Sequence, residues 1–246
     1  MSGVSRVFGE VAALYDDIRP GYPAGLAPAL TEYRRGGFGS VVDVGAGTGK
    51  GTAALLALGA PITCVEPDPR MAAVLAAKFP QVSVVTATFE EWAAPAGGID
   101  LIASATAWHW TRAETRNQRA FDALAPGGVL AVFHNRFEYV DAEVSAAIGA
   151  VLFDADSTVD ERPAHWSLLD VQRSGIFADV TEREWHSYPV LSTEQYLQLM
   201  QTFSPFRMHP PAVQQRQLTG LADALARFDD RVTMDIRTLL TLARRP

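Results

Sequence analysis

The sequence contains a single cysteine and no long uninterrupted apolar segment. One cysteine cannot form an intramolecular disulfide, and the position of Cys64 within an apolar stretch predicts a buried thiol rather than a reactive one. Uncharged apolar runs stay shorter than a membrane span, and Arg6 and Glu10 interrupt the start of the chain. We therefore expect no membrane segment and no signal peptide, and a cytoplasmic protein.

Positive charge is also scarce. The chain has 21 Lys and Arg against 28 Asp and Glu, a formal net charge of −7, so it lacks the basic footprint that a nucleic-acid partner requires. Its 5 histidines show no paired helical spacing and no His-Glu-x-x-His motif, and a single cysteine cannot build a thiolate site. We expect neither a nucleic-acid partner nor a bound metal.

Residues 41–49 read Val-Val-Asp-Val-Gly-Ala-Gly-Thr-Gly and organise the rest of the chain. A continuous apolar run before a turn is typical of a strand buried on both faces of a parallel sheet. Glycines at alternating positions let the chain bend sharply and let a ligand approach bare backbone. Residues 50–58 then read as a helix, whose N-terminal amides point toward that ligand.

The spacing of this loop excludes two common phosphate-binding motifs. A P-loop needs a glycine at Val44 and Ser or Thr at Gly51, and a dinucleotide fingerprint needs a third glycine at Lys50. Asp43 stands directly before the loop, where a carboxylate disfavours a pyrophosphate and favours a cationic ligand. S-adenosylmethionine fits this requirement, because it carries an ammonium and a sulfonium and no phosphate.

Glu66 ends the next predicted strand, residues 61–65. It follows Asp43 by 66 − 43 = 23 residues, close to the spacing at which an acid meets ribose hydroxyls in doubly wound folds. The alternative is an acid that caps the following helix. Because of the loop upstream, we favour ribose binding.

These features resemble the class I S-adenosylmethionine-dependent methyltransferases, and the resemblance covers nearly all of the chain. It is carried by residues 41–49, by Val65-Glu66-Pro67-Asp68 and by Leu124-Ala125-Pro126-Gly127-Gly128, the turn that this family uses before its fifth strand. The chain is most similar to the bacterial small-molecule branch, including trans-aconitate methyltransferase-like proteins. Two segments point to that branch, residues 15–23 with Tyr15, Arg19 and Tyr22, and Trp108-His109-Trp110.

The resemblance implies an α/β fold, a Rossmann-like seven-stranded mostly parallel sheet with an antiparallel last strand, helices on both faces and a small helical cap. It implies one methyltransferase domain over 1–246, with an N-terminal lid at 1–35, a cofactor-binding core at 36–140, a C-terminal half with the cap at 141–230 and a last strand at 231–246. The apolar patterns predict strands at 41–44, 61–65, 82–86, 99–103, 129–133, 180–190 and 232–242, and helices at 4–15, 24–33, 50–58, 71–79, 112–123, 141–153, 165–175, 193–203 and 218–228.

The resemblance also implies a set of cofactor-binding residues. Tyr15 and Arg19 are expected at the cofactor's carboxylate or at the substrate, with a packed lid as the alternative. The family often has an Asp at its adenine site, where this chain has Thr88, followed by Phe89 and Glu90. The complete expected set is Tyr15, Arg19, Asp43, Gly45, Ala46, Gly47, Gly49, Glu66, Pro67, Thr88, Phe89 and Glu90.

Catalytic candidates lie where two strands are expected to end. His109 follows the strand at 99–103 and His134 follows the strand at 129–133, and ligands bind outside the carboxyl ends of strands in open parallel sheets. His109 is the candidate general base, because histidine titrates near neutrality; orientation of substrate and simple packing between two tryptophans are the alternatives. The expected substrate contacts are Tyr22, Trp108, Trp110 and Asn135.

The expected reaction is methyl transfer from S-adenosylmethionine to a small molecule, at a carboxylate or hydroxyl, with S-adenosylhomocysteine as product. The loop after 99–103 lacks both the Asn/Asp-Pro-Pro-aromatic tetrad and the Pro-Cys nucleophile of other branches. Three alternatives stay open: other chemistry such as cyclisation, a catalytically silent cofactor-binding partner, and a nicotinamide oxidoreductase, which Lys50 disfavours. A monomer or homodimer is expected.

Overall fold

The structure is a computed structural model that describes residues 16, 18–153 and 162–246. The predicted helix at 4–15 lies outside the described residues. The chain divides into two compact units. The larger unit holds residues 21–135, 164–185 and 238–246, and the smaller unit holds the described residues among 1–20, 136–163 and 186–237.

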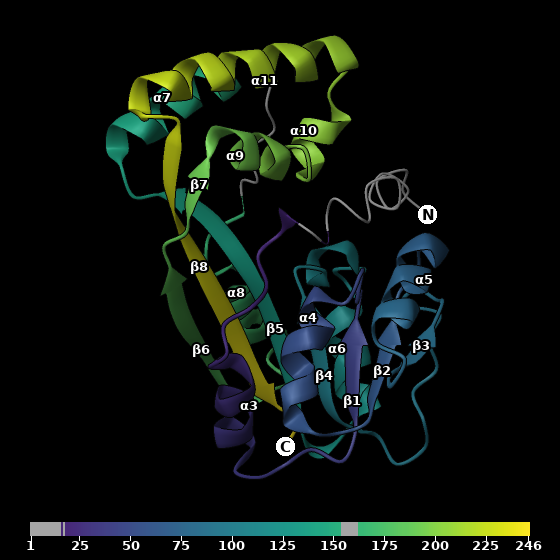
Figure 1. The fold of residues 1–246 in the computed structure, drawn as a ribbon. Helices are drawn as coiled ribbons and strands as arrows, with labels where there is room; N and C mark the ends of the chain where they lie inside the picture. The colour runs from purple at the N-terminus through teal and green to yellow at the C-terminus, as the bar shows by residue number, and fades with distance from the viewer. Residues whose placement is uncertain (1–15, 17, 154–161) are drawn as a thin grey trace. The chain divides into compact units, whose positions relative to one another are not determined.

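An eight-stranded sheet has the strand order β3-β2-β1-β4-β5-β8-β6, and β7 pairs with β8 beside this path (Figure 1). The seven strands of the path agree with the predicted number, and β7 is an addition. Neighbouring strands from β3 through β5 are parallel, whereas β7 and β8 are antiparallel. The mostly parallel α/β sheet with antiparallel C-terminal strands is therefore confirmed.

Helices of the larger unit alternate with its strands, as the apolar periodicity predicts. Their bounds, in chain order, are α3 Leu26–Arg34, β1 Val41–Val44, α4 Lys50–Leu55, η1 Leu56–Leu58, β2 Ile62–Val65, α5 Pro69–Lys78, β3 Ser83–Val85, β4 Ile99–Ala105, η2 Trp108–Trp110, α6 Arg116–Ala123, β5 Leu124–Tyr139, α8 Trp166–Ser174 and β6 Ala178–Ser187. Strands β5 and β6 each continue from this unit into the smaller one.

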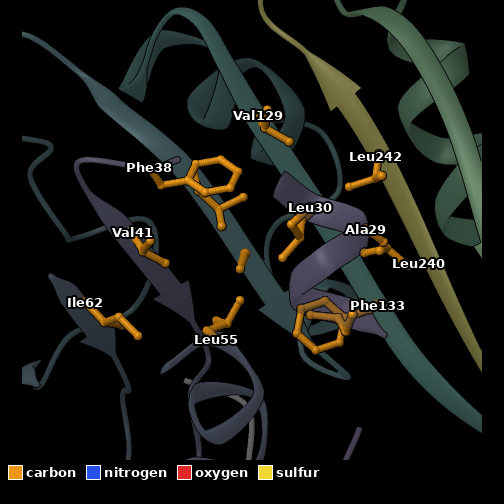
Figure 2. Packing of buried hydrophobic residues seen from close by; sticks show 14 of the residues in the cluster. Ala29, Leu30, Phe38, Val41, Leu55, Ile62, Val129, Phe133, Leu240 and Leu242 are labelled. Atoms are coloured by element: carbon orange, nitrogen blue, oxygen red, sulfur yellow. The ribbon is translucent and has the colours of Figure 1, made fainter. Parts of the chain in front are cut away.

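Successive residues of the parallel strands bury their side chains on opposite faces of the sheet, as the period of two requires. One face packs against α3, α4 and α5 through residues such as Val41, Val129 and Phe133, which Figure 2 labels. The other face packs against α6 and α8 through Val42 and Leu130. Each of β1, β4 and β5 is thus covered by helices on both sides, which explains the near-continuous apolar composition of these strands.

The smaller unit forms its own core around three helices and the first part of β8. Its elements are α7 Ala142–Phe153, β7 Val190–Ser192, α9 Thr193–Met200, α10 Ser204–Met208, α11 Pro211–Leu225, η3 Ala226–Phe228 and β8 Arg231–Arg244. Tyr196 and Leu221 are fully buried there, with Val232 from β8. The Tyr196 hydroxyl lies 2.5 Å from that of Tyr139. The apolar residues Tyr196, Met200, Phe203 and Phe206 of the predicted cap are expected to be core residues; Tyr196, Met200 and Phe206 are buried, and Phe203 is partly buried against the same core.

Several predicted bounds are wrong, among them that of the helix predicted at 218–228, which begins at Pro211 as α11. The strand predicted at 129–133 runs on to Tyr139 within β5, and the helix predicted at 112–123 begins only at Arg116. The strand predicted at 180–190 is two strands, β6 and β7, because the chain breaks at Tyr188 and Pro189. The extension of β5 changes how its polar residues are placed.

Candidate functional site

Asp43 lies near the end of strand β1 and is fully buried. Its Oδ2 accepts a hydrogen bond of 2.7 Å from the Thr52 hydroxyl of α4. Its Oδ1 has no hydrogen-bond partner among the described residues. Burial raises the pKa of Asp43 to about 7, the Thr52 hydrogen bond opposes that rise and the charge of Glu66 adds to it. A buried carboxylate with a spare acceptor oxygen suits a ligand that brings a donor or a positive charge.

The glycine loop connects β1 to α4 through a backbone with positive φ. A side chain at Gly45 (φ 67°) would place its Cβ 2.4 Å from the Cβ of Ala107. At Gly47 (φ 58°) the nearest atom would be the Met71 Cε at 3.9 Å. Gly45 is therefore required for close packing on the segment after β4, whereas Gly47 leaves room beside the backbone.

Glu66 follows β2 and is bound to the same loop. Its carboxylate accepts 2.8 Å and 2.9 Å hydrogen bonds from the backbone amides of Gly47 and Asp68. Burial raises the pKa of Glu66, while these two hydrogen bonds lower it. The loop and the acid thus hold each other in place, and the two acids predicted to bind cofactor lie at the ends of adjacent strands.

The residues expected at the adenine site have other partners in the structure. Thr88 donates from its hydroxyl to the Glu91 carboxylate at 2.9 Å, so Glu91, which the sequence analysis did not select, holds this turn. Glu90 accepts 2.7 Å from the backbone amide of Arg112. Phe89 is buried in the core. Ala46 is also buried and Pro67 is partly exposed.

Thr106, just after β4, has a backbone conformation that threonine rarely adopts. Its φ is 54°, in the left-handed region that disfavours a β-branched residue. Its amide donates 2.8 Å to the Phe133 carbonyl, and its hydroxyl lies 2.8 Å from that of Tyr22. The Tyr22 ring packs edge-on against the Phe133 ring at 4.6 Å. Sequence analysis missed Thr106, because no residue pattern signals a strained backbone.

The Trp108-His109-Trp110 segment forms a short 3-10 helix, η2, in which the three side chains differ in exposure. Trp108 is fully buried, and its Nε1 donates 3.3 Å to the Asp170 carboxylate of α8. It therefore anchors the segment instead of lining a surface. Trp110 is 51% exposed, and its ring centroid lies 4.5 Å from that of the partly exposed His109.

His134 and Asn135 lie within β5 and point to opposite faces of the sheet. The His134 Nε2 lies 3.3 Å from the Ala164 carbonyl oxygen. Asn135 donates 3.1 Å to the Gly21 carbonyl and accepts 2.7 Å from the Thr238 hydroxyl. The expectation that the strand ends before His134 is wrong, because β5 continues to Tyr139 and successive side chains alternate between the two faces.

Trp166 at the start of α8 contacts both predicted catalytic histidines. Its ring centroid lies 6.1 Å from that of His109 and 5.8 Å from that of His134. Sequence analysis did not select Trp166, because it lies far along the chain from both histidines and sits in a segment read only as a helix. The structure thus places His109 and His134 beside the Trp166 ring. Tyr22 packs against Phe133, and Asn135 binds the Gly21 carbonyl.

Arg19 is in the smaller unit. Its guanidinium donates 2.8 Å to the Thr202 hydroxyl and lies 3.9 Å from the centroid of the Phe203 ring. Tyr15 lies outside the described residues. In the part of the chain that the structure describes, no group of three or more His, Cys, Asp or Glu residues is placed to hold a metal ion. No helix of that part is long and apolar enough to cross a bilayer.

Comparisons with known proteins identify the family of this chain. The model of a methyltransferase domain family matches residues 41–128, which contain the loop, Glu66 and η2. An uncharacterised methyltransferase of Mycobacterium tuberculosis is 30% identical over 231 residues, covering 91% of this chain and 87% of the relative. The chain belongs to the class I S-adenosylmethionine-dependent methyltransferases.

Solved methyltransferases share the fold across most of the chain. A protein described as a type II methyltransferase from Anaeromyxobacter dehalogenans superposes with a TM-score of 0.68 at 20% identity, covering 92% of this chain and 97% of the other. Phosphoethanolamine N-methyltransferase 2 of Haemonchus contortus, solved with S-adenosylhomocysteine, gives a TM-score of 0.58 at 13% identity, covering 100% of this chain and 61% of the other.

The residues of this methyltransferase fit the cofactor of its family. The spare Oδ1 of buried Asp43 suits an ammonium, and the open side of Gly47 lets a ligand approach the backbone. The buried acids at the ends of β1 and β2 favour a ligand of positive charge, because burial and the charge of Glu66 raise the pKa of Asp43 and a nearby cation would offset that cost of ionisation.

Proposed function

We propose that this methyltransferase transfers a methyl group from S-adenosylmethionine to a small-molecule acceptor and releases S-adenosylhomocysteine. The observation that supports this most is the fully buried Asp43 with its unpartnered Oδ1, beside a loop that Glu66 holds. We assign Asp43, Gly45, Ala46, Gly47, Gly49, Glu66 and Pro67 to cofactor binding. The roles of Tyr15, Arg19, Thr88, Phe89 and Glu90 stay predictions.

When bound, S-adenosylmethionine supplies an electrophilic methyl group on a positively charged sulfur. The protein then has to align the acceptor and exclude water, and such positioning supplies about 7–11 kcal/mol of barrier reduction. His109 takes the proton of a hydroxyl acceptor, a contribution of roughly 10²–10⁴-fold, whereas a carboxylate acceptor needs no base. His134 is a second candidate for contact with the acceptor.

The finer assignments rest on the sequence. We propose a small acceptor and a bacterial, trans-aconitate methyltransferase-like branch, a cytoplasmic location and a monomer or homodimer. We also propose that both compact units serve one methyltransferase domain over 1–246, because β5, β6 and β8 each contribute residues to both units.

Isothermal titration with S-adenosylmethionine and S-adenosylhomocysteine tests the cofactor assignment. We expect Asp43→Ala and Glu66→Ala each to weaken binding at least tenfold, because each removes a buried carboxylate from the ligand side of the loop. Asp100→Asn is the matched control. Asp100 opens β4 at the other end of the parallel strands, where it binds Arg34 and the Gly39 amide, and its loss should leave affinity unchanged.

Unchanged affinity in folded Asp43→Ala and Glu66→Ala proteins would contradict the site assignment. Binding without transfer of a labelled methyl group to any acceptor would favour the alternatives of cyclisation or a silent cofactor-binding partner. Preferential binding of a nicotinamide cofactor would favour an oxidoreductase.

A further inference from the structure

Asp43 belongs to a chain of three buried side chains. Cys64 of β2 is the register partner of Asp43 in β1, so both side chains leave the same face of the sheet. The Thr52 hydroxyl of α4 reaches both of them, at 2.7 Å from the Asp43 Oδ2 and 3.5 Å from the Cys64 Sγ. All three residues are fully buried. The protons of this chain are therefore shared among protein groups that bulk solvent does not reach.

The Thr52 hydroxyl has one proton to donate, and this proton sets the direction of the chain. An ionised carboxylate is a stronger acceptor than a thiol, so the hydroxyl donates to the Oδ2 of Asp43. The Cys64 thiol then donates to the Thr52 oxygen. Burial and the charge of Asp43 raise the pKa of Cys64 to about 12, so the thiol keeps the proton that it donates.

The two carboxylate oxygens of Asp43 have different surroundings. Oδ2 accepts from Thr52, and α4 packs closely on it, because a Cβ added at Gly51 would lie 3.5 Å from this oxygen. Oδ1 has no hydrogen-bond partner among the described residues. The Thr52 hydroxyl thus occupies one oxygen and leaves the other for a ligand.

The charge state of Asp43 depends on a small set of neighbours. Burial raises its pKa to about 7, the Thr52 hydrogen bond opposes this rise and the charge of Glu66 adds to it. The second titratable neighbour is the Cys64 thiol, which reaches Asp43 through Thr52. On the opposite side, β4 places the uncharged Ala103 beside Asp43. The Thr52 hydroxyl is therefore the contact that favours the ionised carboxylate.

We propose that Thr52 is a positioning residue for the cofactor: it keeps Asp43 ionised with Oδ1 left for the cofactor's ammonium, and cofactor binding is thereby coupled to the release of a proton. This inference rests on the proposed function and adds a pH dependence to the same site. In the neutral form of Asp43 the proton lies on Oδ1, because Oδ2 accepts from Thr52. A cation that binds there displaces this proton to solvent, and the charge of the site stays balanced.

Calorimetric titration with S-adenosylhomocysteine from pH 6 to pH 8.5 tests the coupling. The affinity of the wild-type protein should fall about tenfold from pH 8 to pH 6, because the fraction of ionised Asp43 falls by that factor around a pKa of about 7. Titrations at pH 7 in phosphate and in Tris, whose ionisation enthalpies differ, give the number of protons released. We expect about half a proton per ligand, since Asp43 is then half protonated.

Variants of Thr52 separate the hydroxyl from the packing. Thr52→Val keeps the shape and should bind about fivefold more weakly than wild type at pH 7 but less than about twofold at pH 8.5, because the lost hydrogen bond favoured the ionised carboxylate by about tenfold. Its proton release at pH 7 should rise to about one per ligand. Thr52→Ser keeps the hydroxyl and should stay within about twofold of wild type. Thr241→Val, which removes a buried hydroxyl that binds Ser167 in the same unit, is the matched control and should behave as wild type.

The two proposals fail in different ways. Absence of S-adenosylhomocysteine binding by the wild-type protein between pH 6 and pH 8.5 would overturn the proposed function and this inference with it. An equal loss of affinity in Thr52→Val at every pH, with unchanged proton release, would overturn only the role of Thr52, and so would a Thr52→Ser protein that binds as weakly as Thr52→Val. If Thr52→Val does not fold, Thr52→Ala removes the same hydroxyl and is judged by the same pH profile.

Discussion

Gly45 and Gly47 have similar backbone angles, but the structure requires glycine at each for a different reason. An alanine at either position pays about 1 kcal/mol for the left-handed conformation. At Gly45 the added Cβ would also overlap the Ala107 Cβ at 2.4 Å, whereas at Gly47 it would meet only van der Waals contact. We expect Gly45→Ala to lower the free energy of unfolding by about 2–4 kcal/mol and Gly47→Ala by about 1 kcal/mol.

Urea unfolding of the two variants measures this difference. Ala107→Gly is the control, because in the Gly45→Ala background it removes the atom that clashes and should restore part of the lost stability. Equal losses in the two single variants, or no rescue by Ala107→Gly, would contradict the packing argument.

The charge of Asp43 is expected to cost stability. Its folded-state pKa of about 7 lies above the ordinary value of 3.8, so the folded protein binds a proton more tightly than the unfolded chain. The contribution of this group is therefore most favourable below about pH 4 and is lost as the pH rises to about 7. We expect Asp43→Asn, which keeps an acceptor for Thr52, to be more stable than wild type at pH 8 by on the order of 1–3 kcal/mol.

Thermal unfolding from pH 5 to pH 8 tests the sign. The advantage of Asp43→Asn should grow with pH while its affinity for S-adenosylmethionine is lost, so that stability and binding change in opposite directions. A variant that is less stable than wild type at pH 8 would show that the ionised carboxylate is stabilised within the fold.

Among the secondary-structure elements, α9 has the most complete cap. The Ser192 hydroxyl accepts from the Gln195 amide at 3.2 Å, and the Gln195 side chain accepts from the Ser192 amide at 3.0 Å. We expect Ser192→Ala to lower the free energy of unfolding by roughly 0.5–2 kcal/mol and Ser192→Asp to retain most of it, because Asp also caps helices. Urea unfolding measures both, and equal stability of the Ala and Asp variants would argue against the cap.

Among the helices, strands and loops, those that depend on residues close together in the chain were predicted best. The glycine loop after β1 and the helices predicted at 165–175 and 193–203 depend on residues close together in the chain, and the structure confirms that loop and the helices α8 and α9. The length of β5 was not predictable in the same way. Its second half mixes polar and aromatic residues, and its pairing with β8 depends on residues about a hundred positions away.

The same reasoning holds for the candidate site. Asp43 and Glu66 could be assigned to the ends of two strands from the sequence, because Asp43 lies near the end of one apolar strand run and Glu66 directly follows the next. Trp166 could not, since tertiary contacts bring α8 to His109, among them the hydrogen bonds of Asp170 to Arg116 and Trp108. Thr106 was not predictable either, because its positive φ depends on tertiary contacts that Thr106 makes with Tyr22 and Phe133.

At the scale of the whole molecule, the two compact units provide a test of where the cofactor acts. The expected cofactor residues from Asp43 to Glu90 lie in the larger unit, and so do all 5 tryptophans. Tryptophan fluorescence therefore reports unfolding of the larger unit, whereas far-ultraviolet circular dichroism also reports the helices α7, α9 and α11 of the smaller unit. Comparing the two signals during urea unfolding separates the units if they unfold independently.

S-adenosylhomocysteine at about 100 times its Kd should stabilise the fluorescence-detected transition by about 2.7 kcal/mol, because a ligand that binds only the folded state shifts the equilibrium by mass action. Asp100→Asn should show the same gain, and Glu66→Ala at most about half of it, because at least tenfold weaker binding leaves the ligand at no more than about ten times the Kd of the variant. If the circular dichroism shows a separate transition of the smaller unit, that transition should move less. A gain confined to the smaller unit would place the cofactor away from Asp43 and Glu66 and would contradict the site.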